Sequence, residues 1–318
     1  MLFQLPLSLL SPAGPRARLS ILIFHRVLRE RDPLFPGEVE AGEFDRICEW
    51  ADSMFTVLPL HEAAARQVSG TLPARALSIT FDDGYADNHD VAMPILQRHG
   101  LTATIFVATG FLNGGRMWND TIIESIRRTT KDALDLRSIG VDGLGELELK
   151  SLDQRRAAIA KLIGAIKHKH PVERQALVQA VADTAAAALP SDLMMSTEQV
   201  RALHGGGMQI GAHTVTHPIL ASLPLSEARQ EIAESREVLQ AILGERVGLF
   251  AYPNGRPGHD YTPDNVRQVR ELGFDAAVST TWGAARAGTD CFQLPRFSPW
   301  DRERKRFGLR MMRNLWAT

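Results

Sequence analysis

The sequence has few of the features that mark membrane, secreted or nucleic-acid-binding proteins. Its two cysteines, Cys48 and Cys291, are too few for a disulfide framework or a four-cysteine zinc site. No apolar run approaches the ~20 residues that a membrane-spanning helix needs. The 36 basic and 37 acidic side chains nearly cancel, so charge gives no reason to expect a nucleic-acid partner. With 44% hydrophobic and 23% charged residues, the 318-residue chain has the composition of a globular protein.

The two ends of the chain differ in character. Residues 2–10 are apolar, but no basic segment precedes them and Pro6 interrupts them, so we expect no cleaved signal peptide and a cytoplasmic protein. Residues 301–318 are basic with apolar side chains between the charges, which predicts a basic C-terminal helix. Such a helix could touch an anionic membrane surface, although packing on its own domain is the more common arrangement.

Strand-like and helix-like segments alternate along much of the chain, which is typical of parallel βα architecture. Short apolar runs predict strands at residues 19–25, 76–81, 102–109, 208–213, 247–253, 274–280 and 292–297. Residues 226–244 form the clearest helical pattern. Residues from about 111 to 195 contain strongly helical stretches and no good strand, although residues 137–150 are consistent with a small hairpin. We therefore predict one domain over residues 1–318 with a mostly helical insertion.

Reactive side chains follow four of the predicted strands. Asp82 and Asp83 come directly after the strand at 76–81, and His213 and His217 follow the strand at 208–213. The polar turn "AYPNG" ends another strand, and His25 ends the first one. Because loops converge at the carboxyl ends of parallel strands, these groups are expected to meet there.

Each of these features alone has an ordinary structural explanation. Asp-Asp-Gly is most often a turn, the two histidines lack the glutamate of zinc proteases, and a single histidine is commonly part of a core. Together, however, two imidazoles and one carboxylate form a ligand set that leaves an open position on a catalytic zinc ion. The second carboxylate could then take the proton of a water molecule whose pKa the metal lowers.

Three stretches resemble the motifs of the NodB-homology polysaccharide deacetylases, the fourth carbohydrate esterase family: "TFDDGYADN", "GMQIGAHTVTHP" and, more loosely, "FAYPNG". They anchor roughly residues 20–110 and 195–300. The resemblance implies a distorted (β/α) barrel and hydrolysis of N-acetyl groups on amino-sugar polymers. It also implies one divalent metal, with Zn²⁺ as the first choice and Co²⁺ or Ni²⁺ as alternatives.

The resemblance also assigns roles to individual residues. Asp82 resembles the general base and Asp83 a metal ligand, while His213 and His217 resemble the other two ligands. The backbone N–H of Tyr252 would help to hold the oxyanion.

Two positions depart from the family pattern. Many members carry an arginine before the aromatic-proline pair of the third motif, where this chain has Ala251. Many also have a late histidine that protonates the leaving amine, whereas the last predicted strand here contains Arg296 instead. Arginine is too basic to serve as that acid. The segment "ILIFHRV" resembles the first strand of the poly-N-acetylglucosamine deacetylase branch, which makes His25 the candidate acid and Arg296 an orienting partner for Asp82 or substrate.

Aromatic and polar side chains near the strand ends are candidates for contact with sugar rings, although each could equally serve packing. This substrate-binding set comprises Tyr85, Trp118, Asn119, Pro253, Trp282 and Trp300.

Three functions remain open on the sequence alone. The first is a metal-dependent deacetylase of a GlcNAc-type polysaccharide or oligosaccharide, and the second is a deacetylase or deformylase of a small or lipid-linked amino sugar. The third is an inactive saccharide-binding module. The ligand set favours an enzyme, while the missing late histidine favours the binding module. The oligomeric state is not predicted.

Overall fold

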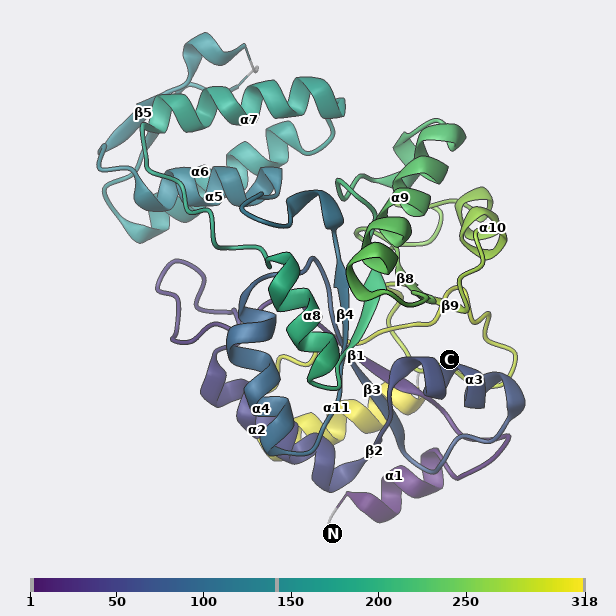
Figure 1. The fold of residues 1–318 in the computed structure, drawn as a ribbon. Coiled ribbons are helices and arrows are strands. Elements are labelled where there is room, and N and C mark those ends of the chain that lie inside the picture. Colours follow the sequence, from purple (N-terminus) through teal and green to yellow (C-terminus); the bar gives the residue numbers. More distant parts are fainter. Residues whose placement is uncertain (1–2, 141–142, 317–318) are drawn as a thin grey trace. The chain divides into compact units, whose positions relative to one another are not determined.

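The computed structural model describes residues 3–140 and 143–316 (Figure 1). The chain divides into two compact units. The first comprises Met1–Glu30, Val39–Leu112 and Met195–Thr318, and the second comprises Arg31–Glu38 and Asn113–Met194. No helix in the described part of the chain is long and apolar enough to cross a membrane.

The first unit is built on a sheet of seven parallel strands. The strands lie in the order β1-β3-β4-β7-β8-β9, and β2 pairs with β3 beside this path. Their bounds are β1 (Ser20–Phe24), β2 (Thr56–Val57), β3 (Ala76–Phe81), β4 (Thr104–Val107), β7 (Gln209–Ala212), β8 (Leu249–Ala251) and β9 (Ala276–Val278). All but the short β2 correspond to predicted strands, because strands buried on both faces appear in a sequence as continuous apolar runs.

Residues 294–297 join the two ends of this sheet. Leu294 bridges to Val278 in β9, and Phe297 bridges to Leu22 in β1, both in parallel orientation. The Phe297 N–H donates to the Ile21 carbonyl at 2.8 Å, and the Ile23 N–H donates to the Phe297 carbonyl at 3.0 Å. The predicted last strand thus forms isolated bridges, and the curled sheet is the expected distorted (β/α) barrel.

Alternate residues of the strands pack on opposite faces of the sheet. Leu22 and Phe24 belong to one buried apolar cluster, whereas Leu19 and Ile21 belong to another. Residues 294–297 follow the same alternation, with Leu294 in the second cluster and Phe297 in the first.

Eight α-helices belong to the first unit in the described part of the chain (Figure 1): α1 (Gln4–Leu10), α2 (Ala41–Met54), α3 (Leu60–Ser69), α4 (Met93–Arg98), α8 (Thr197–Gly205), α9 (Leu225–Leu243), α10 (Pro263–Glu271) and α11 (Arg304–Trp316). A π-helical turn, Asn88–Ala92, leads into α4. The expected C-terminal helix is α11.

The second unit has its own apolar core. It contains α5 (Trp118–Arg128), α6 (Leu152–Ile166) and α7 (Pro171–Ala185), which bury side chains such as Ile122, Leu162 and Val178 in one cluster. It also contains an antiparallel pair of strands, β5 (Ala133–Asp135) and β6 (Glu146–Glu148). The sequence indicated no strand at β5, because three residues are too few to give a detectable alternation.

Candidate active site

Three side chains from two strand ends converge in the first unit. Asp83 follows β3, and His213 and His217 follow β7. The Nε2 atoms of His213 and His217 each lie 3.4 Å from the same atom, Oδ1 of Asp83. One possible ligand atom from each residue lies within 4.8 Å of the other two.

This cluster has the properties of a metal site. Asp83 Oδ1 is buried and has no hydrogen-bond partner among the described residues, and both histidine contacts are longer than an ordinary N–H···O bond. A buried carboxylate oxygen without a partner is costly, and a cation shared with two imidazoles would satisfy it. The three residues therefore fit a divalent metal.

The ring of His213 is oriented by a hydrogen bond at the nitrogen that faces away from Asp83. Its Nδ1 lies 2.7 Å from the backbone carbonyl oxygen of Ala251. Because a carbonyl oxygen only accepts, Nδ1 carries a proton, and Nε2, the nitrogen nearest Asp83, is the atom that the neutral ring offers to a metal. Metal-ligating histidines commonly have such a backing partner.

The backbone of both loops is held in the left-handed region. Asp83, Thr214 and His217 have φ values of 77°, 64° and 54°, which non-glycine residues adopt only when the surroundings stabilise them. The Thr214 hydroxyl accepts the His217 N–H at 3.1 Å. The Asp83 carbonyl accepts the Ala108 N–H at 3.2 Å. Hydrogen bonds within and between the loops after β3, β4 and β7 thus stabilise these strained backbone conformations.

Glu231 in α9 holds the loop between the two histidines, a role that the sequence did not indicate. Its Oε2 accepts the N–H groups of Val215 and Thr216 at 2.8 Å each, and its Oε1 accepts the Thr216 hydroxyl at 2.7 Å. Three bonds to one carboxylate fix the turn that aims His213 and His217, so Glu231 is a positioning residue.

Asp82 forms a buried ion pair with Arg296. The two guanidinium nitrogens of Arg296 donate to the two carboxylate oxygens of Asp82 at 2.6 and 2.7 Å. Arg296 Nε donates to the Ser279 carbonyl at 2.9 Å. The side chains are 4% and 0% exposed for Asp82 and Arg296, so bulk water screens the attraction between the two charges only weakly. Of the two partners expected for Arg296, the structure therefore provides Asp82.

The local charges favour ionised carboxylates. Burial alone would raise the pKa of Asp82, but the charges of Arg296, His213 and His25 outweigh it and the pKa is lowered. The pKa of Asp83 is also lowered despite burial, through His213, His217 and His25. Both acids are therefore anionic at neutral pH, as a ligand and a base must be.

The pKa values of His213 and His217 are shifted in opposite directions. Burial lowers the pKa of His217 to about 4, against the opposing charge of Asp83. Burial also acts on His213, but Asp82 and Asp83 together raise its pKa. His217 is thus neutral at pH 7, which is the form that binds metal.

His25 lies at the end of β1 and is held there by residues of the first motif. Its carbonyl oxygen accepts the Asn88 side-chain amide at 2.9 Å. Asp87 accepts the Val27 N–H at 3.1 Å and pairs with Arg26 Nε at 2.8 Å. The His25 side chain is exposed, and it is near enough for its charge to lower the pKa values of Asp82 and Asp83. The sequence did not predict the anchoring roles of Asp87 and Asn88.

The backbone N–H of Tyr252 is not free in this structure. It donates to the Val278 carbonyl at 3.3 Å, as part of the pairing between β8 and β9. The Tyr252 hydroxyl donates to the Phe292 carbonyl at 3.1 Å, and its ring stacks on Tyr261 at 3.8 Å. The expected oxyanion donor is therefore already engaged by the sheet, and we assign it no catalytic role. Pro253, beside it, is also buried.

The predicted sugar platforms have other partners in the structure. Tyr85 is only 4% exposed and Arg26 lies over its ring at 4.7 Å, so the prediction that it stacks on a sugar is wrong. Trp282 and Trp300 are exposed, but their rings contact Arg313 and Arg310 of α11. Trp118 and Asn119 begin α5 in the second unit, where Arg174 lies 5.2 Å from the centre of the Trp118 ring.

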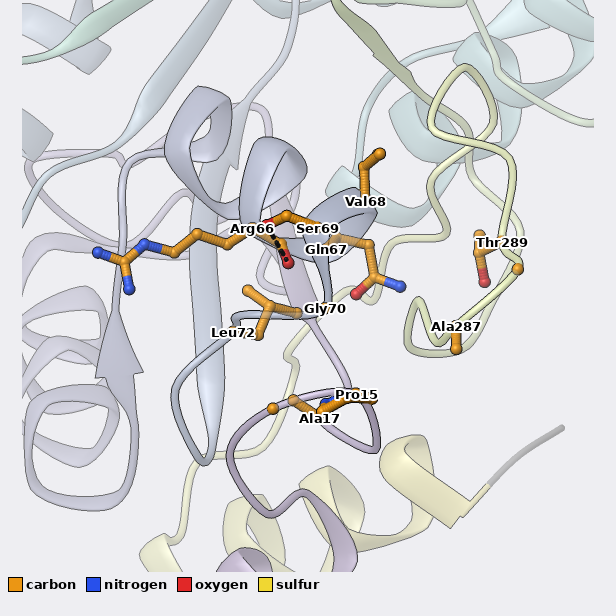
Figure 2. A pocket seen from close by; sticks show the side chains of 12 residues that line it. Pro15, Ala17, Arg66, Gln67, Val68, Ser69, Gly70, Leu72, Ala287 and Thr289 are labelled. Carbon is orange, nitrogen blue, oxygen red and sulfur yellow. Dashed lines mark hydrogen bonds between the residues drawn. The ribbon is translucent and has the colours of Figure 1, made fainter.

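A separate cavity of about 420 Å³ lies at the end of α3 and lacks the side chains that an active site would need (Figure 2). Among the described residues that line it there is no histidine, cysteine or acid. Its one cation, Arg66, extends away from the loop that carries Ala287 and Thr289 (Figure 2) and pairs with Glu62 at 2.8 Å. This cavity therefore offers, from its described residues, no group for acid–base or metal chemistry.

The chain resembles known proteins along most of its length. Residues 69–277 match the family model described as polysaccharide deacetylase. The YxkH protein of Bacillus subtilis (strain 168), whose name assigns it provisionally to the polysaccharide deacetylases, is 22% identical over 282 residues, or 88% of this chain and 71% of that protein.

Two solved structures show the same fold. The Streptococcus pyogenes deacetylase PplD in complex with acetate has a TM-score of 0.62 and 19% identity, covering 94% of this chain and 99% of that one. IcaB from Ammonifex degensii has a TM-score of 0.59 and 18% identity, covering 96% and 99%.

Removing any one residue of the cluster should release metal. We expect Asp83→Ala, His213→Ala and His217→Ala each to lose bound divalent metal, because two remaining ligands hold an ion poorly. Elemental analysis of the purified variants measures this. His204→Ala, which changes a half-buried histidine of α8 outside the cluster, should keep its metal. Full occupancy in any cluster variant would remove that residue from the ligand set.

Replacing Arg296 should reverse the pKa shift of Asp82. In Arg296→Met, only the charges of His213 and His25 still oppose burial, so the pKa of Asp82 should rise and the acidic limb of the pH–rate profile should move to higher pH. The wild-type pair stabilises the fold above the unfolded pKa of Asp, about 3.9. The variant should instead lose about 3–5 kcal/mol at neutral pH and recover stability as the pH falls.

Urea unfolding at acidic and neutral pH measures this change. The matched double variant Asp82→Asn/Arg296→Met removes both charges and should regain most of the loss at neutral pH. An Arg296→Met variant as stable as the wild type at neutral pH would show that the pair does not depend on its charge.

Proposed function

Because the chain belongs to the polysaccharide deacetylase family, and is thus a deacetylase, we propose that it is a metal-dependent hydrolase that removes N-acetyl groups from a GlcNAc-type polysaccharide or oligosaccharide. The observation that carries this proposal is the cluster of Asp83, His213 and His217 directly beside a buried, ionised Asp82. An ionised carboxylate beside the metal ligands is what a hydrolase needs in order to take a proton from water.

The metal residues are Asp83, His213 and His217. Two imidazole nitrogens and one carboxylate oxygen suit Zn²⁺, with Co²⁺ or Ni²⁺ as alternatives. A divalent cation bound there would polarise the acetyl carbonyl group and lower the pKa of water at the site.

Asp82 is the proposed general base. It neighbours the ligand Asp83 in sequence, and its lowered pKa keeps it able to accept a proton at neutral pH. Arg296 holds both of its oxygens, which fixes the direction of the carboxylate. In the reaction, water adds to the acetyl carbon and gives its proton to Asp82, the C–N bond breaks, and acetate leaves.

His25 is the proposed general acid. The nitrogen that leaves must take up a proton to become an amine, and Arg296 cannot supply one. His25 directly follows the neighbouring strand β1, is exposed, and interacts electrostatically with both aspartates. Histidine is the side chain that most often donates or accepts a proton in this way during catalysis.

Asp82→Asn tests the proposed function directly. We expect the variant to retain its metal and lose about 10²–10⁴-fold in the rate of acetate release from an acetylated chitooligosaccharide. Asp153→Asn, which changes a side chain that is 91% exposed, is the matched control and should keep wild-type activity.

Other outcomes of this assay would favour the other functions. Activity on a small or lipid-linked N-acyl amino sugar, but not on the oligosaccharide, would narrow the substrate. Metal binding without turnover of any acetylated amino sugar would indicate a saccharide-binding protein and would contradict the proposal.

His25→Ala should affect amide and ester substrates differently. The leaving group of an aryl acetate is a stable phenolate that needs no proton, whereas the leaving amine of an N-acetyl sugar must be protonated. We expect the variant to lose about 10²-fold or more on the oligosaccharide and to keep most of its rate on the aryl ester. His89→Ala is the control. Equal losses on both substrates would give His25 a structural role, and no loss would assign the acid to another group.

A further inference from the structure

Helices α1 and α11 together present an unusual concentration of exposed apolar side chains. We define the α1–α11 surface by the exposed side chains of Leu5, Leu9, Leu309 and Trp316, which are 70%, 76%, 58% and 72% exposed. Leu5 and Leu9 are four residues apart and therefore lie on one face of α1. Single exposed apolar residues are common, but a group of four on two adjacent helices calls for an explanation.

The two helices also enclose an apolar groove. A cavity of about 560 Å³ is lined by Pro6, Leu9, Leu10, Met312, Arg313 and Trp316. Apart from the guanidinium of Arg313, these side chains are apolar, and no acid lies among them. The groove is thus an apolar depression with a cation at its rim.

The outer apolar residues are not required to attach the helices. The inner face of α11 already buries Phe307, Met311 and Leu315, and Phe307 packs on Trp50 with ring centres 5.6 Å apart. On its own inner face, α1 buries Leu7. The exposed residues are therefore additional to those that pack α1 and α11 onto the first unit.

The charged side chains of α11 itself are all basic. Helix α11 carries Arg304, Lys305, Arg306, Arg310 and Arg313 and no acidic residue, while α1 has no charged residue at all. Some of these cations have acidic partners, such as Arg310 with Asp301 and Arg304 with Glu49. Lys305 and Arg313 have no acidic partner within the described parts of the chain. This local excess stands out in a chain whose net charge is −1.

We propose that the α1–α11 surface binds an anionic lipid membrane. Leucine and tryptophan side chains flanked by cations are the features that insert at the boundary between headgroups and acyl chains. A second copy of the chain fits less well, because a twofold contact would place the cations of one α11 against those of the other. The proposal adds α1 to the membrane contact that the basic C-terminal residues predicted.

The position of this surface leaves the candidate active site accessible. The end of α11 is tied to the beginning of β1, where Asn314 Nδ2 donates to Ser20 Oγ at 3.2 Å and Arg18 donates to the Leu315 carbonyl. His25 follows the opposite end of β1. A chain bound through α1 and α11 would therefore keep the carboxyl ends of the strands away from the lipid.

Vesicle sedimentation with the full chain tests the proposal. We expect the wild type to bind phosphatidylcholine vesicles that contain roughly 30% phosphatidylglycerol, and to bind pure phosphatidylcholine much more weakly. Leu9→Glu and Trp316→Glu should each reduce binding by about tenfold or more, since each places a charge in the contact. Lys305→Glu/Arg313→Glu should remove the preference for anionic lipid.

Matched variants elsewhere on the protein provide the controls. Val68→Glu changes a valine of α3 that is 70% exposed, and Lys161→Glu/Arg286→Glu reverses two exposed cations. Both should bind vesicles as the wild type does, and circular dichroism should show all variants folded. A wild type that binds neither vesicle, or controls that lose as much binding, would overturn the proposal. Concentration-dependent dimerisation abolished by Leu9→Glu, without vesicle binding, would assign the surface to a second copy.

Discussion

The ion pair between Asp82 and Arg296 is the interaction on which the site depends. It links the end of β3 to residues 294–297, which bridge β9 and β1 and so join the two ends of the sheet. Leu294 and Arg296 lie two residues apart and project to the same face, whereas Phe297 packs into the opposite cluster. Inside the sheet the two charges cannot be solvated, so each needs the other. The segment that closes the barrel therefore also carries the side chain that orients the proposed base.

Much of the fold follows from the sequence, and the exceptions have physical causes. The parallel strands are buried on both faces, so β1, β3 and β4 appear in the sequence as short, mostly apolar runs. A surface helix would instead show apolar residues three or four positions apart. By contrast, β2 has two residues and β5 three, and such short segments carry no period. Residues 292–297 were expected as a strand and instead contribute isolated bridges.

The candidate site divides in the same way. Residue types and strand-end positions predicted two histidines and one of the two aspartates as ligands. The family resemblance chose Asp83, which lies 3.4 Å from both histidines in the structure. Glu231 could not be predicted, because its role arises only when α9 packs beside the loop after β7. The engagement of the Tyr252 N–H depends on the register of β8 against β9, and the burial of Tyr85 depends on Arg26. Roles set by residue chemistry could be predicted, whereas roles set by packing could not.

The two departures from the family pattern have a common explanation in this geometry. Ala251 stands where many members have an arginine, and Arg296 stands on the segment where many have the late histidine. Arg296 reaches Asp82 from that segment, so it supplies the positive charge that Ala251 cannot. Because Arg296 fills the interior position, a histidine acid cannot occupy it as well. The adjacent strand is β1, through the bridge from Phe297 to Leu22, and β1 ends in His25. If Arg296 orients the base and His25 is the general acid, the two roles are divided between neighbouring segments. The arginine lies on residues 294–297, and the acid follows β1.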